Sequence, residues 1–238
     1  MKNLALLGGK PVRNKPYPLH STMFGKEEEG ALLEVLKNEH LSGFSARPGK
    51  RFLGGNSVRR IEASISGLFN SHGAVTFNSA TSGLHAALYA AGVSLGDEVI
   101  TSPFTMSATA SSILMCRATP IFCDIEEQTY GINPKEVEGL INEKTKAILP
   151  VDLYGGMPDY TALRAVADEH GLKIIEDAAE AIGSEFDGRK AGGLGDVAAF
   201  SFHGSKTFTT GEGGMLVTDD DTIHARVMHL RDHGREPG

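Results

Sequence analysis

The sequence contains no tryptophan and only two cysteines in 238 residues. Cys116 and Cys123 lie seven positions apart in apolar sequence, without the closely spaced Cys or His pairs of a zinc site. A secreted protein held together by disulfides would ordinarily carry more cysteines than this. We therefore expect both side chains to be buried, reduced thiols.

Positive charge is in short supply as well. Lysine and arginine total 23 against 30 aspartates and glutamates, which gives a formal net charge of −7 and a pI near 5.7. Proteins that bind DNA or RNA attract the phosphates with an excess of positive charge. The composition therefore argues against nucleic acid as a partner.

Long hydrophobic runs are absent too. The N-terminal apolar run covers only residues 4–7 before two glycines, which is too short for the core of a signal peptide. No stretch of the sequence approaches the roughly 18 apolar residues that a membrane-spanning helix requires. We expect neither export nor membrane insertion, and therefore a cytoplasmic protein.

With 40% hydrophobic and 22% charged residues, the sequence does contain enough apolar material for a globular core. Residues 1–25 carry several glycines and prolines without a sustained period, so we expect an N-terminal arm. Residues 27–38 predict a short amphipathic helix and residues 40–56 a loop, and from Ser57 onward helical and extended patterns alternate. The extended, mainly apolar segments are residues 74–77, 98–101, 120–125, 147–151, 172–175, 197–202 and 214–218.

Apolar residues at helical spacing fill the intervals between these segments. One predicted helix stops at Gly92, and another begins at Asn133 and Pro134 and is expected to end near residue 144. This alternation predicts an α/β fold with a largely parallel sheet covered by helices. The chain ends four residues after Gly234 without a small domain that could seal one side of these layers. We expect the front part of a longer protein, with the C-terminal small domain absent from this sequence.

In open α/β sheets, ligands bind beyond the carboxyl ends of the strands. Residues 78–83 (NSATSG) follow the predicted strand that ends at Phe77. Small and hydroxyl side chains at a helix N-terminus leave backbone N–H groups free to bind an anion. Simple capping of the helix by Ser79 or Thr81 is the alternative.

Three further segments follow strands in the same way. Glu176 and Asp177 need a cationic partner there, although an aspartate can also cap the next segment. Lys206 lies among small and apolar residues, which suits a nucleophilic amine that forms an imine. The alternative is an ordinary surface lysine without a chemical role. Residues 102–106 bring apolar side chains to this edge or pack in the core. Together, an anion cradle, an acid, an amine and an apolar platform match the phosphate, ring nitrogen, aldehyde and ring face of pyridoxal 5′-phosphate (PLP).

In this order, the segments resemble the DegT/StrS family of sugar and aminocyclitol aminotransferases. The resemblance is most specific at residues 205–214 (SKTFTTGEGG). It implies an α/β protein: the three-layer large domain of a fold-type-I PLP transferase, with a mostly parallel central sheet, formed by residues 26–238. It also implies PLP as the cofactor, and no metal. The matching segments are residues 6–11, 78–81, 176–183, 201–214 and 230–234.

The resemblance implies roles for individual residues. Lys206 would bind the cofactor as a Schiff base and act as general base, and Asp177 would pair with the ring nitrogen. The other contacts would come from Ala80, Thr81 and Ser201 to the phosphate, from Ala179 and Met106 to the two ring faces, and from Glu180 near the ring hydroxyl. Family members commonly have an aromatic residue in place of Met106, and Gln or His in place of Glu180. A glutamate at that position resembles the perosamine-synthase branch, as does the whole segment 177–183.

The leading interpretation is a PLP-dependent aminotransferase that moves an amino group from glutamate or glutamine to a keto group of a nucleotide-linked sugar or a cyclitol. The resemblance also implies a homodimer. The alternatives are a non-catalytic or regulatory PLP-binding paralogue, an inactive fragment, or a PLP-dependent sugar dehydratase. Lys206 excludes the dehydratase branch in which histidine replaces the lysine. An oxidoreductase or kinase is disfavoured, because residues 211–214 and 204–207 match neither GxGxxG nor the end of a P-loop.

Overall fold

The computed structural model describes residues 4–15, 24–37, 41, 44 and 52–235. Its internal contacts divide the chain into two units, Met1–Ser42 and Gly43–Gly238. The first unit contains the short turn η1 (Ala5–Leu7) and helix α1 (Lys26–Lys37). This division places α1 with the N-terminal residues, so the inclusion of residues 26–42 in the large domain stays a prediction.

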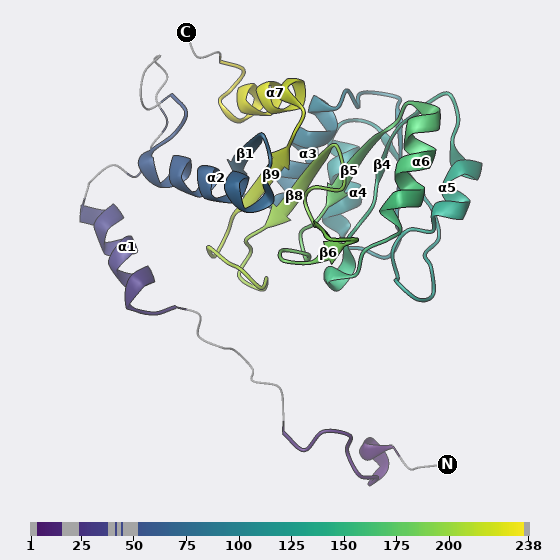
Figure 1. The fold of residues 1–238 in the computed structure, drawn as a ribbon, viewed down its shortest axis with the longest axis horizontal. Helices are drawn as coiled ribbons and strands as arrows, with labels where there is room; N and C mark the ends of the chain where they lie inside the picture. Colours follow the sequence, from purple (N-terminus) through teal and green to yellow (C-terminus); the bar gives the residue numbers. More distant parts are fainter. Residues whose placement is uncertain (1–3, 16–23, 38–40, 42–43, 45–51, 236–238) are drawn as a thin grey trace. The chain divides into compact units, whose positions relative to one another are not determined.

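A seven-stranded sheet forms the centre of the second unit, counted over the described residues (Figure 1). Its strands are β1 (Gly73–Phe77), β2 (Glu98–Thr101), β3 (Thr119–Phe122), β4 (Thr145–Leu149), β5 (Lys173–Asp177), β8 (Val197–Ser201) and β9 (Gly214–Thr218). Their order across the sheet is β1-β9-β8-β5-β4-β2-β3. Only β9 runs antiparallel to its neighbours, β1 and β8, and the other pairs are parallel. The predicted mostly parallel sheet is confirmed.

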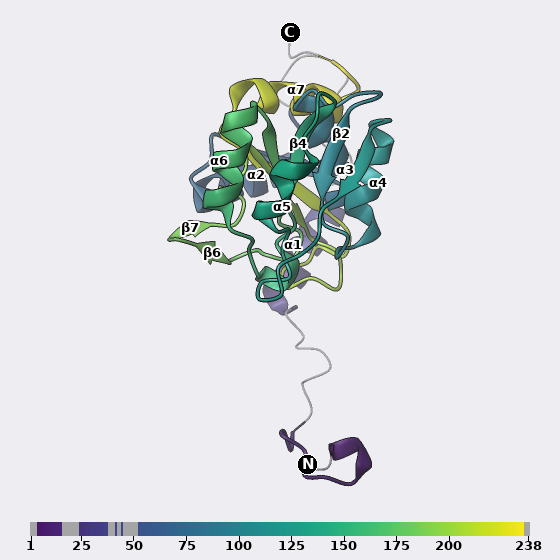
Figure 2. The same ribbon diagram turned by 90° about the vertical axis from the view of Figure 1, so that its right-hand side faces the viewer.

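Helices cover both faces of this sheet and make three layers (Figures 1 and 2). The helices on one face are α3 (Ala80–Ala90), α4 (Ser107–Met115) and α7 (Asp221–Arg231). Those on the other are α2 (Asn56–Phe69), α5 (Pro134–Leu140) and α6 (Tyr160–His170). A separate hairpin of β6 (Glu185–Phe186) and β7 (Arg189–Lys190), which the sequence pattern did not predict, follows β5.

The central strands β8 and β9 are mainly apolar because they are buried on both faces of the sheet. In β8, Val197 and Ala199 pack into the core beneath α3. The alternate residues Ala198 and Phe200 pack into the core beneath α2. Successive side chains of a strand point to opposite faces, so each central strand contributes to two cores. Because helices cover both faces, the sheet is rigid, and it fixes the positions of the loops that follow the strand ends.

Several predicted boundaries were wrong by a few residues. The strand predicted at residues 147–151 is β4 (Thr145–Leu149), and the one predicted at residues 172–175 is β5 (Lys173–Asp177). Helix α5 ends at Leu140 rather than near residue 144. The side chain of Asn142 accepts the N–H of Lys144, and the N–H of Asn142 donates to Thr145, so a hydrogen-bonded turn replaces the last helical turn. The strand predicted at residues 120–125 is β3, which ends at Phe122.

The two cysteines are buried free thiols, as predicted. Burial raises the pKa of Cys116 to about 11, and burial together with nearby carboxylates does the same for Cys123. Thiols with so high a pKa are unreactive at neutral pH. The cysteines therefore serve as small core residues.

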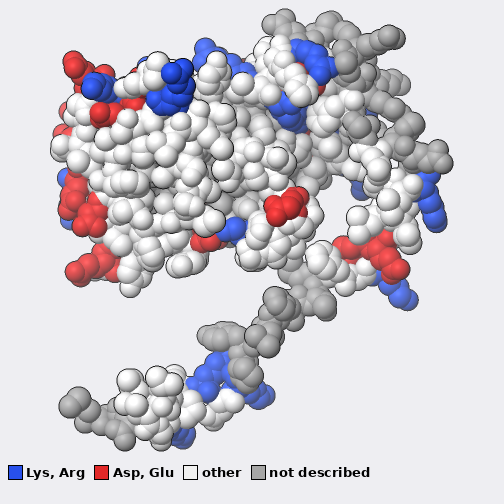
Figure 3. Space-filling model, turned by 180° about the vertical axis from the view of Figure 1, so that it is seen from behind, with Lys and Arg blue, Asp and Glu red and all other residues white. Residues whose placement is uncertain are grey.

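Helices α3 and α4 contain no charged residue over their described length. The view from behind accordingly shows a broad face with few charged side chains, bordered by Lys, Arg, Asp and Glu at its edges (Figure 3). Exposed apolar side chains on these helices include Tyr89, Leu114 and Met115. Among the described helices, none has the length and apolar character needed to span a membrane.

Candidate functional site

The candidate site lies where several strands meet at one edge of the sheet. Strands β1, β5 and β8 end there, at Phe77, Asp177 and Ser201. Strand β9 runs the other way and therefore begins at this edge, with Gly214 opposite both Phe77 and Ser201. Asp177 lies opposite Ala199 one strand further along. The topology thus gathers the segments that the sequence singled out.

Lys206 lies in the connection between β8 and β9. Because β8 ends and β9 begins at this edge, the intervening loop must stay beside it. Hydrogen bonds fix the loop at both ends, since the carbonyl of Phe202 accepts the N–H of Thr210 at 3.0 Å and the hydroxyl of Thr209 at 3.0 Å. The backbone N–H of Lys206 donates to the carbonyl of His203 at 2.9 Å. These contacts hold the lysine in a defined turn.

The Lys206 side chain enters a pocket of about 390 Å³. Its Nζ donates to Oε1 of Glu180 at 2.8 Å, and the two side chains are 21% and 29% exposed. The other oxygen of Glu180 accepts the N–H of Tyr154 at 3.1 Å. Burial raises the pKa of Glu180, but Lys206 and the Tyr154 N–H outweigh it and lower the pKa overall. The pocket is lined by Tyr154, Ala179, Glu180, Ile182, Ser201, Ser205, Lys206 and Thr207.

Asp177 is a buried carboxyl group beside this pocket. Its Oδ2 accepts the hydroxyl of Thr109 at 2.7 Å, and its Oδ1 accepts the N–H of Ala179 at 3.2 Å. Burial raises the pKa of Asp177, while these two donors and the charge of Lys206 oppose the rise. A positive charge placed next to Asp177 would therefore stabilise its ionised form.

The N-terminus of α3 forms the third part of the site. The side chain of Ser79 accepts the N–H of Ser82 and caps the helix. Gly214 packs so closely against this end that a Cβ on it would lie 2.3 Å from the carbonyl carbon of Ser79 and 2.6 Å from the nitrogen of Ala80. Ala80 and Thr81 begin the helix. Capping, which was the alternative for Ser79, is confirmed, and it leaves the first N–H groups able to bind an anion.

The structure thus brings most of the sequence-derived residues to one edge. Four of them, Ala179, Glu180, Ser201 and Lys206, line a single pocket. The residues that line this pocket do not include Met106, whose side chain is 70% exposed before α4. Its contact with a ring face stays a prediction.

Sequence reasoning did not find Thr109, and it misjudged Glu176. The expectation of a cationic partner for Glu176 was wrong, because its carboxylate accepts backbone N–H groups of Gly192, Leu194 and Gly195. Thr109 is 68 positions from Asp177 in the sequence, and no local pattern marks it. The only available signal was that Thr109 carries a hydroxyl in the first turn of α4, the helix that follows the end of β2.

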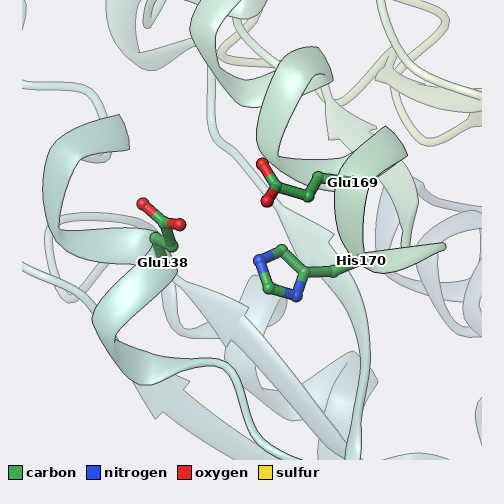
Figure 4. Close-up of side chains that lie close together, drawn as sticks. All are labelled: Glu138, Glu169 and His170. Atoms are coloured by element: carbon green, nitrogen blue, oxygen red, sulfur yellow. The ribbon is translucent and has the colours of Figure 1, made fainter.

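One group of metal-ligand-type side chains lies away from this edge, on the surface. Glu138 of α5 and Glu169 and His170 of α6 face one another, with ligand-type atoms within 4.8 Å (Figure 4). All three are exposed, and exposed acidic groups commonly lie together without a metal ion. We assign this cluster no role.

Fold and site together define an α/β protein of three layers, with an amine, carboxylates and a helix N-terminus at the carboxyl edge of its sheet. The DegT/DnrJ/EryC1/StrS aminotransferase family profile matches residues 39–238, and the chain belongs to this family. The resemblance in the sequence is thereby confirmed, as is the fold type I that it implied.

Three similar proteins illustrate the family. The chain is 46% identical to GDP-perosamine synthase of Caulobacter vibrioides over 69% of this chain and 44% of that protein. It is 40% identical to a putative L-glutamine:3-amino-2,3-dideoxy-scyllo-inosose aminotransferase of Streptoalloteichus tenebrarius, over 98% of this chain and 54% of that protein. The putative sugar aminotransferase Spr1654 of Streptococcus pneumoniae, solved in a PLP form, superposes with a TM-score of 0.79 at 28% identity, over 90% and 57% of the two chains. The chain spans about half the length of the curated relatives it matches.

Proposed function

We propose that this chain is the PLP-binding part of an aminotransferase that moves an amino group from glutamate or glutamine to a keto group of a nucleotide-linked sugar or a cyclitol. The observation that carries the proposal is the pocket in which the Lys206 amine faces Glu180, beside the buried carboxyl of Asp177. Family membership and the names of the relatives support it.

The residues present suit PLP. The α3 N-terminus and Ser201 offer hydrogen-bond donors for a phosphate, with Ala80 and Thr81 at the start of the helix. Gly214 adds no side chain to this end, where a Cβ would collide with the backbone of Ser79 and Ala80. Asp177 would hold the ring nitrogen, and Lys206 would bind the aldehyde. When bound, PLP supplies an electron sink for breaking bonds at the amino-bearing carbon.

The protein's own residues then have separate tasks. The Asp177 carboxylate favours a proton on the ring nitrogen, because an opposite charge raises the pKa of that nitrogen. Lys206 Nζ, once released, moves a proton as general base and acid. Glu180 orients that amine through its 2.8 Å hydrogen bond. The glutamate at this position resembles the perosamine-synthase branch, and the similar proteins include both a GDP-perosamine synthase and a putative inosose aminotransferase.

The remaining features of the proposal concern partners and location. The uncharged face over α3 and α4 supports a homodimer, since exposed apolar surface favours association. The net charge of −7 supports a small-molecule substrate rather than nucleic acid. A cytoplasmic location fits the sugar nucleotide substrates proposed here.

Borohydride trapping tests the site. We expect PLP to bind the purified protein, and borohydride followed by peptide mapping to place the label on Lys206. Lys190 is the matched control, because it is also ion-paired to a glutamate but lies outside the pocket. Lys206→Ala should abolish labelling and Lys190→Ala should leave it intact. Label on another lysine, or none, would refute the assignment.

Activity is tested separately, with keto-sugar nucleotides and keto-cyclitols as acceptors and glutamate or glutamine as donor. Transfer that depends on Lys206 supports an aminotransferase. PLP binding without transfer to any acceptor would favour the non-catalytic or regulatory alternative, and loss of water from the sugar would favour a dehydratase.

A further inference from the structure

Two buried carboxyl groups lie next to Asp177, and the proposed function uses neither. Asp152 and Glu176 are both 0% exposed. Asp152 follows Val151, which bridges to Asp177, and the N–H of Asp152 donates to the carbonyl of Asp177 at 3.1 Å. Glu176 precedes Asp177 in β5. Asp152 and Glu176 therefore lie beside the backbone of Asp177, whose side chain contacts α4 on one face of the sheet whereas that of Asp152 contacts α6 on the other.

The hydrogen bonds of Asp152 and Glu176 are unequal. Glu176 accepts three backbone N–H groups of residues 192–195, so its negative charge is well stabilised. Asp152 has only the hydroxyl of Tyr160, which donates to Oδ1 at 2.8 Å. Its Oδ2 is buried and has no hydrogen-bond partner among the described residues. A buried oxygen without a partner is costly and requires an explanation.

A proton on Asp152 supplies that explanation. Two adjacent buried carboxylates cannot both keep their charge, and one proton between them relieves the repulsion. Burial, followed by the charge of Glu176, raises the pKa of Asp152 well above its usual range. Burial also raises the pKa of Glu176, but the backbone N–H donors counteract it. The proton therefore belongs to Asp152.

We propose that Asp152 is protonated at neutral pH, donates a hydrogen bond from Oδ2 to Glu176, and in this form is a positioning residue for Asp177. The titratable groups whose charges or hydrogen bonds act on it are Glu176, Tyr160 and Asp177. A neutral Asp152 keeps a further negative charge away from Asp177, whose own ionisation burial already opposes. The role toward Asp177 rests on the proposed function, whereas the proton on Asp152 does not.

The first test compares wild type with Asp152→Asn, in which the amide mimics the protonated acid, without cofactor. The folded wild type keeps a proton that the unfolded chain releases above about pH 4. Its stability therefore falls as pH rises from there toward the folded-state pKa. Urea unfolding from about pH 5 to pH 7 should show the folding constant of wild type falling about tenfold more per pH unit than that of Asp152→Asn.

The exposed residue Asp187 supplies the control, since Asp187→Asn should keep the wild-type slope. Equal slopes in wild type and Asp152→Asn would overturn the proposal. The second measurement is infrared spectroscopy at neutral pH, which needs no stable variant. Wild type and Asp187→Asn should show the C=O stretch of a protonated carboxyl, and Asp152→Asn should lose it. Absence of this band from wild type would also overturn the proposal.

The positioning role has its own readout. PLP affinity of wild type should weaken more at alkaline pH than that of Asp152→Asn, because an ionised Asp152 disfavours the charge on Asp177. An identical pH profile in both proteins would refute that role. If PLP binds neither protein, the proposed function and the positioning role both fail, and the proton on Asp152 is judged by unfolding and infrared spectroscopy.

Discussion

Replacing Gly214 by alanine should disrupt the candidate site from the backbone outward. A Cβ at this position would lie 2.3 Å from the carbonyl carbon of Ser79, 2.4 Å from its oxygen and 2.6 Å from the nitrogen of Ala80. Real contacts of a Cβ are essentially never shorter than 3.0 Å. All three atoms belong to the backbone, so no side chain can rotate away. Either the start of β9 or the N-terminus of α3 must move.

Both movements are costly. The start of β9 is hydrogen-bonded between β1 and β8, where Gly214 pairs with Phe77 and Ser201. The N-terminus of α3 is held by the Ser79 cap, and Leu84 of the same helix is fully buried. Overpacking in a well-packed core costs about 1–3 kcal/mol, and backbone displacement puts this case at about 3 kcal/mol. That corresponds to a loss of about a hundredfold in the folding equilibrium constant.

Urea unfolding measures this loss, and titration with PLP measures the effect on the site. Gly204→Ala is the matched control in the same β8–β9 connection, where a Cβ would only make an ordinary 3.7 Å contact with Gly211. We expect it to change stability by about 0.5 kcal/mol or less. Gly214→Ala should lose about 3 kcal/mol and bind PLP more weakly because the phosphate cradle moves. Equal stability and PLP affinity of the two variants would refute the steric argument.

Two further predictions concern the carboxyl groups of the site. Thr109→Val removes the 2.7 Å donor of buried Asp177 and should cost about 1–3 kcal/mol in urea unfolding, whereas Thr105→Val, which only loses a bond to Thr109, should cost less. Equal losses would contradict the assignment. Burial raises the pKa of Glu180, but Lys206 lowers it overall, so its contribution to stability is full above about pH 4.3 and disappears as pH falls through the folded-state pKa. Glu180→Gln should therefore lose less stability than wild type on acidification from about pH 7 to about pH 3, and a steeper loss would count against the ion pair.

The sequence predicted which segments meet at the sheet edge better than it predicted the contacts between them. Asp177, Ser201 and Lys206 follow apolar runs, and parallel strands bring their carboxyl ends to one edge, so their proximity follows from the fold class alone. The boundaries of β2 and β9 were also predicted, because each of these strands has a buried, apolar centre. The apolar pattern of the sequence is enough to predict these strands and their ends, even when it is not known which helix packs on which strand.

Contacts that depend on helix placement could not be obtained this way. Thr109 reaches Asp177 only because α4 packs across β2 and β3 with that residue facing inward. Tyr154 reaches Glu180 because it adopts a positive φ of 54° in the turn after β4, which no local sequence signal marks for a tyrosine. In both cases tertiary packing, rather than propensity, decides the geometry.

The single antiparallel strand explains why the lysine and the carboxylates can face one another. In a fully parallel sheet, the segment after β8 would lead through a helix to the opposite edge before the next strand began. Here β9 starts at the edge where β8 ends, so residues 202–213 connect the two strands without leaving it. The loop is therefore anchored by strand hydrogen bonds on both sides, and Lys206 is held opposite Glu180 of the β5 connection. The reversal also requires Gly214, because the chain re-enters the sheet directly against the N-terminus of α3. One change of strand direction thus positions the amine and shapes the anion cradle together.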